Sequence, residues 1–266
     1  MRSIFLRYLL VPVALLMVGQ VRAQGVVDRN HVPSKERVDD LQRRKDVVDG
    51  NNLRATITNF LQTAQSGEPG DIFYEWPKNT NRIYVALSQM WVGAEVAATD
   101  GKPLYIVDVA NFRNNLNNGT NSWNFRPIKG YVNPAGRAFG IAQSDEPNSW
   151  PATWPDKAND TTDPGWRGSW NGFFGKDIFN ADQEFFYKAG DDQYDRYPNF
   201  FPDDTDRTRK GLGLVVDARV LAWSQILIQD VVFLLHGIKN DGSKDLNKVG
   251  VSIWLADLVG GDASDD

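Results

Sequence analysis

The chain has 266 residues, of which 24% are charged and 41% hydrophobic, and its formal net charge at pH 7 is −5. This is an ordinary globular balance, and the negative charge argues against nucleic acid as a partner. The absence of cysteine excludes disulfide frameworks, cysteine-ligated metals and thiol nucleophiles. Two histidines are too few for a multi-histidine metal site, whereas aromatic residues are abundant, with 9 Trp, 8 Tyr and 14 Phe.

Residues 1–23 have the pattern of a secretory signal peptide. Two arginines accompany an apolar stretch over residues 8–18, which is too short to span a bilayer, and residues 21–23 (Val-Arg-Ala) fit the small-x-small cleavage rule. We therefore expect the secretion machinery to cleave the chain near Ala23 and deliver a secreted or cell-surface protein. No later stretch is long and apolar enough for a membrane span, so none is expected after signal removal.

Residues 24–52 form a polar leader, with apolar positions too sparse to predict an amphipathic helix. Regular structure is expected to begin near Leu53. Asp100-Gly101 favours a tight turn, which predicts an antiparallel hairpin around it. Runs rich in β-branched and aromatic residues predict strands over 54–61, 82–87, 90–96 and 104–109.

Alternation is lost over residues 111–209, which are rich in Asn, Gly, Pro, Asp and Trp. A structureless loop of this length is unusual in a compact domain, and disordered segments are poor in aromatic residues. This stretch nevertheless holds five of the nine tryptophans. We therefore predict an ordered, irregular insertion that is held together by aromatic packing.

Strands are predicted again over residues 212–223, 226–238 and 248–256, with an Asp-Gly turn at 241–242 before the last, which is expected to pair back. Short connections without helical crossovers favour an antiparallel β-sandwich, Ig-like or jelly-roll-like. The expected domain covers residues 53–266, interrupted by the insertion at about 111–209. The acidic, glycine-rich end predicts truncation at the C-terminus relative to a longer polypeptide.

Several short motifs carry a resemblance to a known group of proteins. They are DIFYEWPKNT at 71–80, WPDK at 154–157, DPGW at 163–166, WNGFFGK at 170–176, ADQE at 181–184, RKGLGL at 209–214 and IWLAD at 253–257. Together they resemble the N-terminal region of large, uncharacterised exported proteins of Bacteroidetes-type bacteria. Such proteins often end in a type IX secretion sorting domain, which the printed sequence does not include. The resemblance covers roughly residues 28–266 and implies export, but it assigns no catalytic residues.

Four tryptophans form a candidate ligand-binding site. Exposed indole rings can stack on sugars, and neighbouring Asn, Asp and Arg side chains can bond the hydroxyl groups. The rings could equally fill the core of the insertion or contact a surface protein, and these alternatives stay open. The four residues, spaced by 4, 12 and 4 positions, are Trp150, Trp154, Trp166 and Trp170.

Acidic residues form two candidate Ca²⁺ sites, since Ca²⁺ takes carboxylate and carbonyl oxygens as ligands. Residues 145–206 hold 14 Asp or Glu against 5 Lys or Arg and include the runs 191–192 and 203–206. Neither site has EF-hand spacing, so a solvated acidic surface is the alternative. The second site consists of Asp257, Asp262, Asp265 and Asp266.

Catalytic chemistry is less well supported. A glycosidase needs two carboxylates across a cleft. The acids in aromatic-rich surroundings are Glu75, Asp163, Asp182 and Glu184. His31 lies in the leader and His236 in a predicted strand, so neither suggests a Ser-His-Asp triad, and no Gly-x-Ser-x-Gly, P-loop or His-Glu-x-x-His motif occurs.

The sequence favours an exported, non-catalytic cell-surface or extracellular module that contacts glycans or proteins. The alternatives are a carbohydrate-active enzyme with a carboxylate pair and a structural spacer of a larger adhesive protein.

Overall fold

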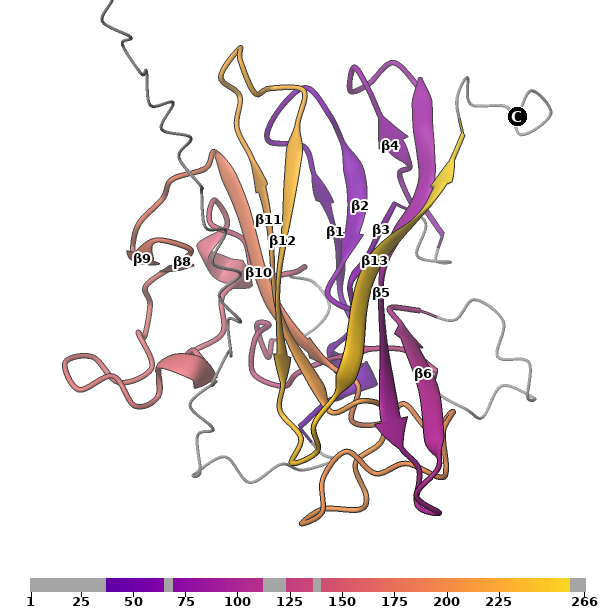
Figure 1. Ribbon diagram of the computed structural model, residues 1–266. Coiled ribbons are helices and arrows are strands. Elements are labelled where there is room, and N and C mark those ends of the chain that lie inside the picture. The colour runs from indigo at the N-terminus through magenta and orange to yellow at the C-terminus, as the bar shows by residue number, and fades with distance from the viewer. Residues whose placement is uncertain (1–36, 65–68, 112–122, 136–139, 259–266) are drawn as a thin grey trace, which may run out of the picture.

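The computed structural model describes residues 37–64, 69–111, 123–135 and 140–258 (Figure 1). The signal sequence and the first part of the predicted leader therefore lie outside the described residues. Within the described ranges, two antiparallel sheets pack face to face as a β-sandwich, and a separate two-stranded hairpin lies beside one of them.

The larger sheet has seven strands in the order β1-β2-β3-β5-β13, and β4 and β6 also pair with β5. Asp100-Gly101 lies in the β5–β6 turn, as predicted, and Gly101 has a positive φ of 80°. The strands of this sheet are β1 (Lys45–Val48), β2 (Ala55–Thr58), β3 (Gln62–Ala64), β4 (Tyr74–Glu75), β5 (Ile83–Ala97), β6 (Pro103–Val109) and β13 (Asn247–Asp257).

The smaller sheet has four strands in the order β12-β11-β10-β7, and β8 pairs only with β9. Three short 3-10 turns are the helical elements of the described residues. The remaining elements are η1 (Asp40–Gln42), β7 (Arg126–Pro127), η2 (Pro147–Ser149), η3 (Pro155–Lys157), β8 (Asn171–Gly172), β9 (Gly175–Lys176), β10 (Gln183–Gly190), β11 (Leu214–Ala222) and β12 (Val232–Asn240).

The predicted strands 82–87 and 90–96 are one continuous strand, β5. The polar pair between them, Ser88 and Gln89, is buried rather than turned out to solvent. The Ser88 hydroxyl shares a 3.0 Å hydrogen bond with the Thr63 hydroxyl. The Gln89 side-chain oxygen accepts a 3.1 Å hydrogen bond from the backbone N–H of Asn111. Because these partners satisfy the polar groups, the strand continues through them.

The irregular insertion contains a regular strand that periodicity did not reveal, so that part of the sequence prediction is wrong. Strand β10 pairs with β11 along its whole length, and seven of its eight residues are buried. Phe185 and Tyr187 face the sandwich core, whereas Phe186 joins a second apolar cluster on the opposite face. A strand covered on both faces has no alternation between apolar and polar residues, so the period-2 signal disappears.

The sequence predicted that the strand at residues 248–256 pairs back onto the strand before it, and this prediction is wrong. Strand β13 crosses to the other sheet and pairs with β5, for example Ile253 with Met90. In Figure 1 β12 and β13 lie beside each other at the front of the molecule, yet each is an edge strand. The connecting residues 241–246 therefore join the two sheets.

The core lies between the sheets and draws apolar residues from both. Met90 and Val92 of β5 and Val216 and Val220 of β11 are at most 1% exposed. Part of the predicted leader belongs to this structure, since Val48 of β1 is fully buried in the same core.

Candidate functional site

The Trp-rich segment builds a second, smaller core on the outer face of the four-stranded sheet. Trp154 and Trp170 are at most 1% exposed, and their rings meet edge to face at 5.6 Å over Phe186 of β10. Trp150 and Trp166 are half-buried against this cluster. The burial of the first pair favours the packing interpretation for them, because a buried ring cannot stack on a ligand.

A buried ion pair fastens the β8–β9 hairpin to the sheet. Glu184 of β10 is 1% exposed and pairs with Arg219 of β11. Its carboxylate also accepts hydrogen bonds from the Phe173 amide at 3.0 Å and the Trp170 indole at 3.3 Å. Arg219 donates to the Asn171 carbonyl at 2.7 Å, so both members of the pair bond the hairpin. Burial lowers the pKa of Arg219, against the opposing effect of Glu184.

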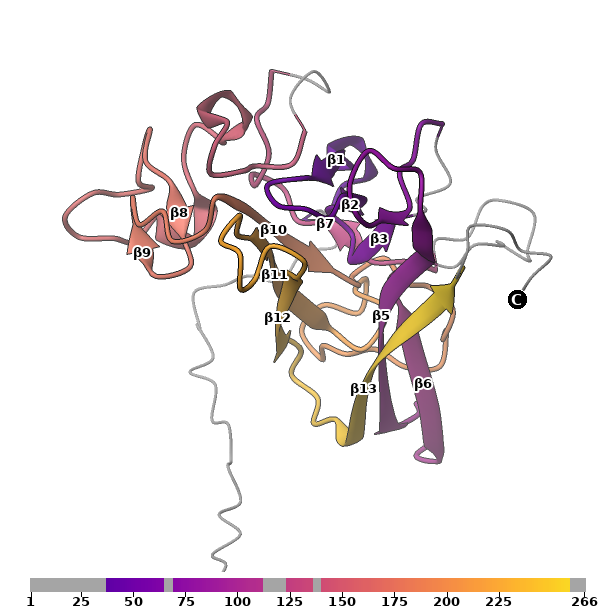
Figure 2. The same cartoon turned by 90° about the horizontal axis from the view of Figure 1, so that it is seen from above.

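Between this insertion and the sheet lies a groove that we name the outer cleft. It consists of a hollow of about 750 Å³ and a second of about 480 Å³, which share Asp156, Asp217 and Gly237. Figure 2 shows β8 and β9 on the side of β10–β12 that faces away from β5 and β13. The floor of the outer cleft includes Phe186, Asp217, Arg219 and Gly237, and its walls include Asp156, Trp166, Asn171, Phe173 and Phe174.

Aromatic rings border the cleft. Phe173 and Phe174, at the tip of the hairpin, are 49% and 62% exposed and meet edge to face at 4.9 Å. On the wall, the Lys157 ammonium lies 4.5 Å from the centre of the Trp166 ring. The Trp166 indole donates a 3.0 Å hydrogen bond to Asp160, which fixes its orientation. Of the four predicted ligand-binding tryptophans, Trp166 is the one that lines the cleft.

Two carboxylates face the cleft from different elements. Asp156 accepts 3.2 Å hydrogen bonds from the Asn171 amide, and Asp217 forms a 2.9 Å ion pair with Lys188. Burial, together with both carboxylates, raises the pKa of the Tyr131 phenol below them. The cleft therefore presents aromatic surface together with hydrogen-bonding groups.

Gly237 leaves space at the floor of the cleft because it has no side chain. It occupies an exposed position of edge strand β12 opposite Asp217. A Cβ atom there would lie 3.6 Å from the nearest atom, which is ordinary van der Waals distance. A side chain could thus be added without strain, and it would project into the cleft.

Two aspartates of the first Ca²⁺ hypothesis, Asp192 and Asp203, are paired with arginine. Arg209 is fully buried and forms ion pairs with Asp192 at 2.8 Å and Asp203 at 3.1 Å. Arg37 contacts the same Asp192 carboxylate and also Asp241, both at 2.5 Å. These carboxylates therefore have protein cations as counter-charges, and they belong to the structure that joins the loop 191–209 to the start of the domain.

Asp191 forms a different arrangement, a buried carboxyl pair with Asp108 of β6. The Leu212 amide donates to both side chains, at 2.9 Å to Asp108 and 2.8 Å to Asp191. Burial raises the pKa of Asp108 to about 7, and burial with the neighbouring carboxyl raises that of Asp191. Gly211, with φ of +66°, is required here because a Cβ atom would come within 2.7 Å of Asp191.

No group of three or more His, Asp or Glu side chains within the described residues is arranged to hold a metal ion. Of the second Ca²⁺ candidate, Asp257 is exposed at the end of β13, while Asp262, Asp265 and Asp266 lie outside the described residues. That hypothesis stays a prediction.

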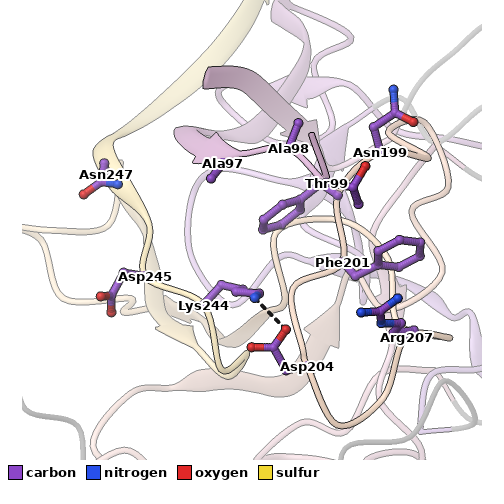
Figure 3. A pocket seen from close by; sticks show the side chains of 11 residues that line it. Ala97, Ala98, Thr99, Asn199, Phe201, Asp204, Arg207, Lys244, Asp245 and Asn247 are labelled. Carbon is purple, nitrogen blue, oxygen red and sulfur yellow. Dashed lines mark ion pairs between the residues drawn. The ribbon is translucent and has the colours of Figure 1, made fainter. Parts of the chain in front are cut away.

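A hollow of about 550 Å³ with mixed polar and apolar lining lies at the β5–β6 end of the molecule, between the 97–99, 199–207 and 244–247 segments. Figure 3 shows Lys244 pointing at Asp204, with which it forms a 2.5 Å ion pair. Phe201 and Arg207 occupy the other side. This hollow lacks a buried polar group aimed into it, so the outer cleft is the stronger candidate site.

The remaining acids of the enzyme hypothesis are dispersed. Glu75 is buried beside Arg54, Asp163 pairs with Lys176 at 2.6 Å, and Asp182 accepts hydrogen bonds from Ser224. Burial lowers the pKa of His236 in β12.

Sequence reasoning did not single out Asp156, Asp217 or Arg219 as site residues. Their juxtaposition depends on the pairing of β10, β11 and β12 and on the docked hairpin, for which the local sequence carries no signal.

Comparisons with known proteins do not add a family. No family model matches the sequence, and neither a curated protein nor a solved structure shows significant similarity to it. Among the described residues, no helix has the length and apolar character that crossing a membrane requires.

Proposed function

We propose that the protein is an exported, non-catalytic module that binds glycans in the outer cleft. The observation that carries the proposal is the cleft itself, in which Trp166, Phe173 and Phe174 lie beside Asp156, Asp217 and Asn171. Its larger hollow, of about 750 Å³, is in the size range of small-ligand sites. Aromatic faces pack on the apolar side of a sugar ring, and carboxylate and amide groups bond its hydroxyls.

The charges of the cleft favour a neutral glycan. Asp217 is paired with Lys188, and Lys157 lies 3.4 Å from Asp156. The other bases that line the cleft, Arg37, Arg219 and Lys239, pair with Asp192, Glu184 and Asp241. Because each base is paired with an acid in this way, the cleft offers hydrogen bonds without a net charge that would select an ionic ligand. Export is the part of the proposal that rests on residues 1–23, and sequencing the N-terminus of protein recovered from the producing cells checks it.

The test is a binding screen against neutral oligosaccharides, followed by titration calorimetry on two cleft variants. Trp166→Ala removes the wall ring, and Gly237→Val fills the floor with a residue that favours strands. We expect each to weaken binding by about tenfold or more, which corresponds to about 1.4 kcal/mol.

The matched control is Trp254→Ala, because Trp254 is 39% exposed on the other sheet and stacks on Trp91 away from the cleft. This variant should bind as the unmodified protein does. Absence of binding across the screen, or equal affinity of all three variants, would contradict the proposal.

A carbohydrate-active enzyme is the second candidate, favoured by one observation. Asp156 and Asp217 face the same cleft from the wall and the floor, as a carboxylate pair must. Both are already engaged by neighbouring side chains, which is why binding ranks first. Release of reducing sugar that Asp217→Asn abolishes, with binding retained, would establish the enzyme instead.

A further inference from the structure

The outer cleft runs lengthwise along strand β12. Alternate residues of a strand lie on the same face of its sheet, and Leu235, Gly237 and Lys239 pair with β11 residues that alternate with those of the core. Leu235 lines the larger hollow, Lys239 lines the smaller one, and Gly237 lines both. At about 3.4 Å per residue, the first and last of these positions are about 13 Å apart. The floor of the cleft is therefore elongated in the direction of the strand.

The floor is continuous between the two hollows because the position where they meet has no side chain. A glycine within a strand weakens it, and such a glycine often marks a place where a ligand comes close to the backbone. A larger residue would fit at Gly237 without a clash, since its Cβ atom would lie 3.6 Å from the nearest atom. Packing within the protein therefore does not require the glycine, whereas a ligand that extends from one hollow into the other needs this open position.

Two carboxylates border the passage between the hollows, and neighbouring side chains fix their positions. Asp156 of η3 accepts 3.2 Å hydrogen bonds from the Asn171 amide, and Asp217 of β11 forms a 2.9 Å ion pair with Lys188. An ionised carboxylate has several acceptor positions on its two oxygens, so hydroxyl groups can bond to it beside these contacts. A ligand that passes over Gly237 therefore meets acceptors from the wall and from the floor.

The two hollows differ in chemistry. The aromatic side chains of the proposed glycan site, Trp166, Phe173 and Phe174, line the larger hollow and not the smaller one. Among the side chains of the smaller hollow are those of Asn159 and Lys239, which are exposed and carry N–H donors. One end of the cleft therefore suits the face of a sugar ring, and the other suits the hydroxyl groups of a further unit.

We propose that the outer cleft binds a linear oligosaccharide along its chain, with one unit on the aromatic rings of the larger hollow and a following unit in the smaller hollow. This inference rests on the proposed glycan binding and adds the length of the ligand and its orientation along β12. The chain passes over Gly237, between Asp156 and Asp217. A monosaccharide, by contrast, occupies one hollow and leaves the contacts of the other unmade.

The first experiment measures how affinity depends on chain length. Titration calorimetry uses linear oligomers of glucose, mannose, galactose and xylose, each from the monosaccharide to the hexasaccharide. For a sugar that binds, affinity should rise by about tenfold or more between the monosaccharide and the tetrasaccharide, because the longer chain reaches both hollows. It should then level off once the cleft is filled.

Two variants separate the contributions of the hollows. Phe174→Ala removes a ring that is 62% exposed in the larger hollow and should weaken the binding of short and long oligomers alike. Asn159→Ala/Lys239→Met removes donors from the smaller hollow and should weaken the tetrasaccharide by about fivefold or more, with the monosaccharide unchanged. The matched control is Thr161→Ala, because Thr161 is exposed in the same loop as Asn159 and lines neither hollow.

Nuclear magnetic resonance of isotope-labelled protein locates the chain on the strand. The tetrasaccharide should shift the backbone amide signals of both Leu235 and Lys239, whereas the monosaccharide should shift one of them only. The amide signals of β6, on the other sheet, should stay unchanged with both sugars.

The results separate this inference from the function on which it rests. Equal affinity of the monosaccharide and the tetrasaccharide, or an unchanged tetrasaccharide affinity in Asn159→Ala/Lys239→Met, would overturn the linear arrangement while glycan binding stands. A tetrasaccharide that shifts the amide of Leu235 without that of Lys239 would do the same. Absence of binding by every oligomer would overturn glycan binding itself, and the linear arrangement with it.

Discussion

The buried carboxyl groups of Asp108 and Asp191 make the stability of the protein depend on pH. Both are buried, and the pKa of Asp108 is raised to about 7, whereas an unfolded aspartate titrates near 4. Between these values the folded protein holds a proton that the unfolded chain releases. Stability from this pair is therefore greatest below about pH 4 and falls as pH rises to about 7.

We predict that Asp108→Asn flattens this dependence. The amide oxygen can still accept from Leu212, and the amide nitrogen can donate to Asp191 without a titrating proton. At pH values between about 5 and 8, the free energy of unfolding of the variant should be about 2–4 kcal/mol higher than that of the unmodified protein. Urea unfolding at several pH values measures this difference.

Other groups also contribute to the pH dependence of stability, such as Asp46, whose pKa is raised to about 6 by burial. Their contributions cancel in the comparison because these groups are the same in both proteins. If the free energy of unfolding of the two proteins changes with pH in parallel, the pair of Asp108 and Asp191 does not hold the additional proton, and the prediction is wrong.

At the scale of elements, the β8–β9 hairpin depends on the Glu184–Arg219 pair. We predict that Glu184→Gln destabilises the protein by about 3 kcal/mol, because it leaves the Arg219 charge buried without its partner. The double variant Glu184→Gln/Arg219→Met removes both charges and should be less destabilised than the single variant. Chemical denaturation of the three proteins measures the coupling, and additive losses would contradict it.

The strands that sequence predicted are those with one apolar face, such as β6 and β11. Alternation did not reveal β10, which is buried on both faces, and β13 was assigned to the wrong partner. Pairing with β5 is decided by sheet packing and not by the Asp-Gly turn before β13. Of the four tryptophans proposed from the sequence, Trp166 lines the outer cleft. The other lining residues come from η3, the β8–β9 hairpin and strands β10 to β12, which no local sequence pattern brings together.

For the whole molecule, β10 joins two cores. Phe185 contributes to the sandwich core, and its neighbour Phe186 contributes to the tryptophan cluster with Trp170. We predict that Phe185→Ala and Trp170→Ala each cost about 3–5 kcal/mol and still unfold in one transition. Far- and near-ultraviolet circular dichroism should change together on heating. A separate, earlier loss of the near-ultraviolet signal in Trp170→Ala would show independent units.

The pairing of β5 with β13 has a kinetic consequence. More than half of the chain separates the two strands in sequence, so their contact has a very high sequence separation. Folding slows as such contacts dominate, since a long loop must close before they form. One edge of β5 stays unpaired until β13 has been synthesised and has reached it. This late closure is well matched to the proposed export, because the chain has time to be translocated before it acquires its native shape.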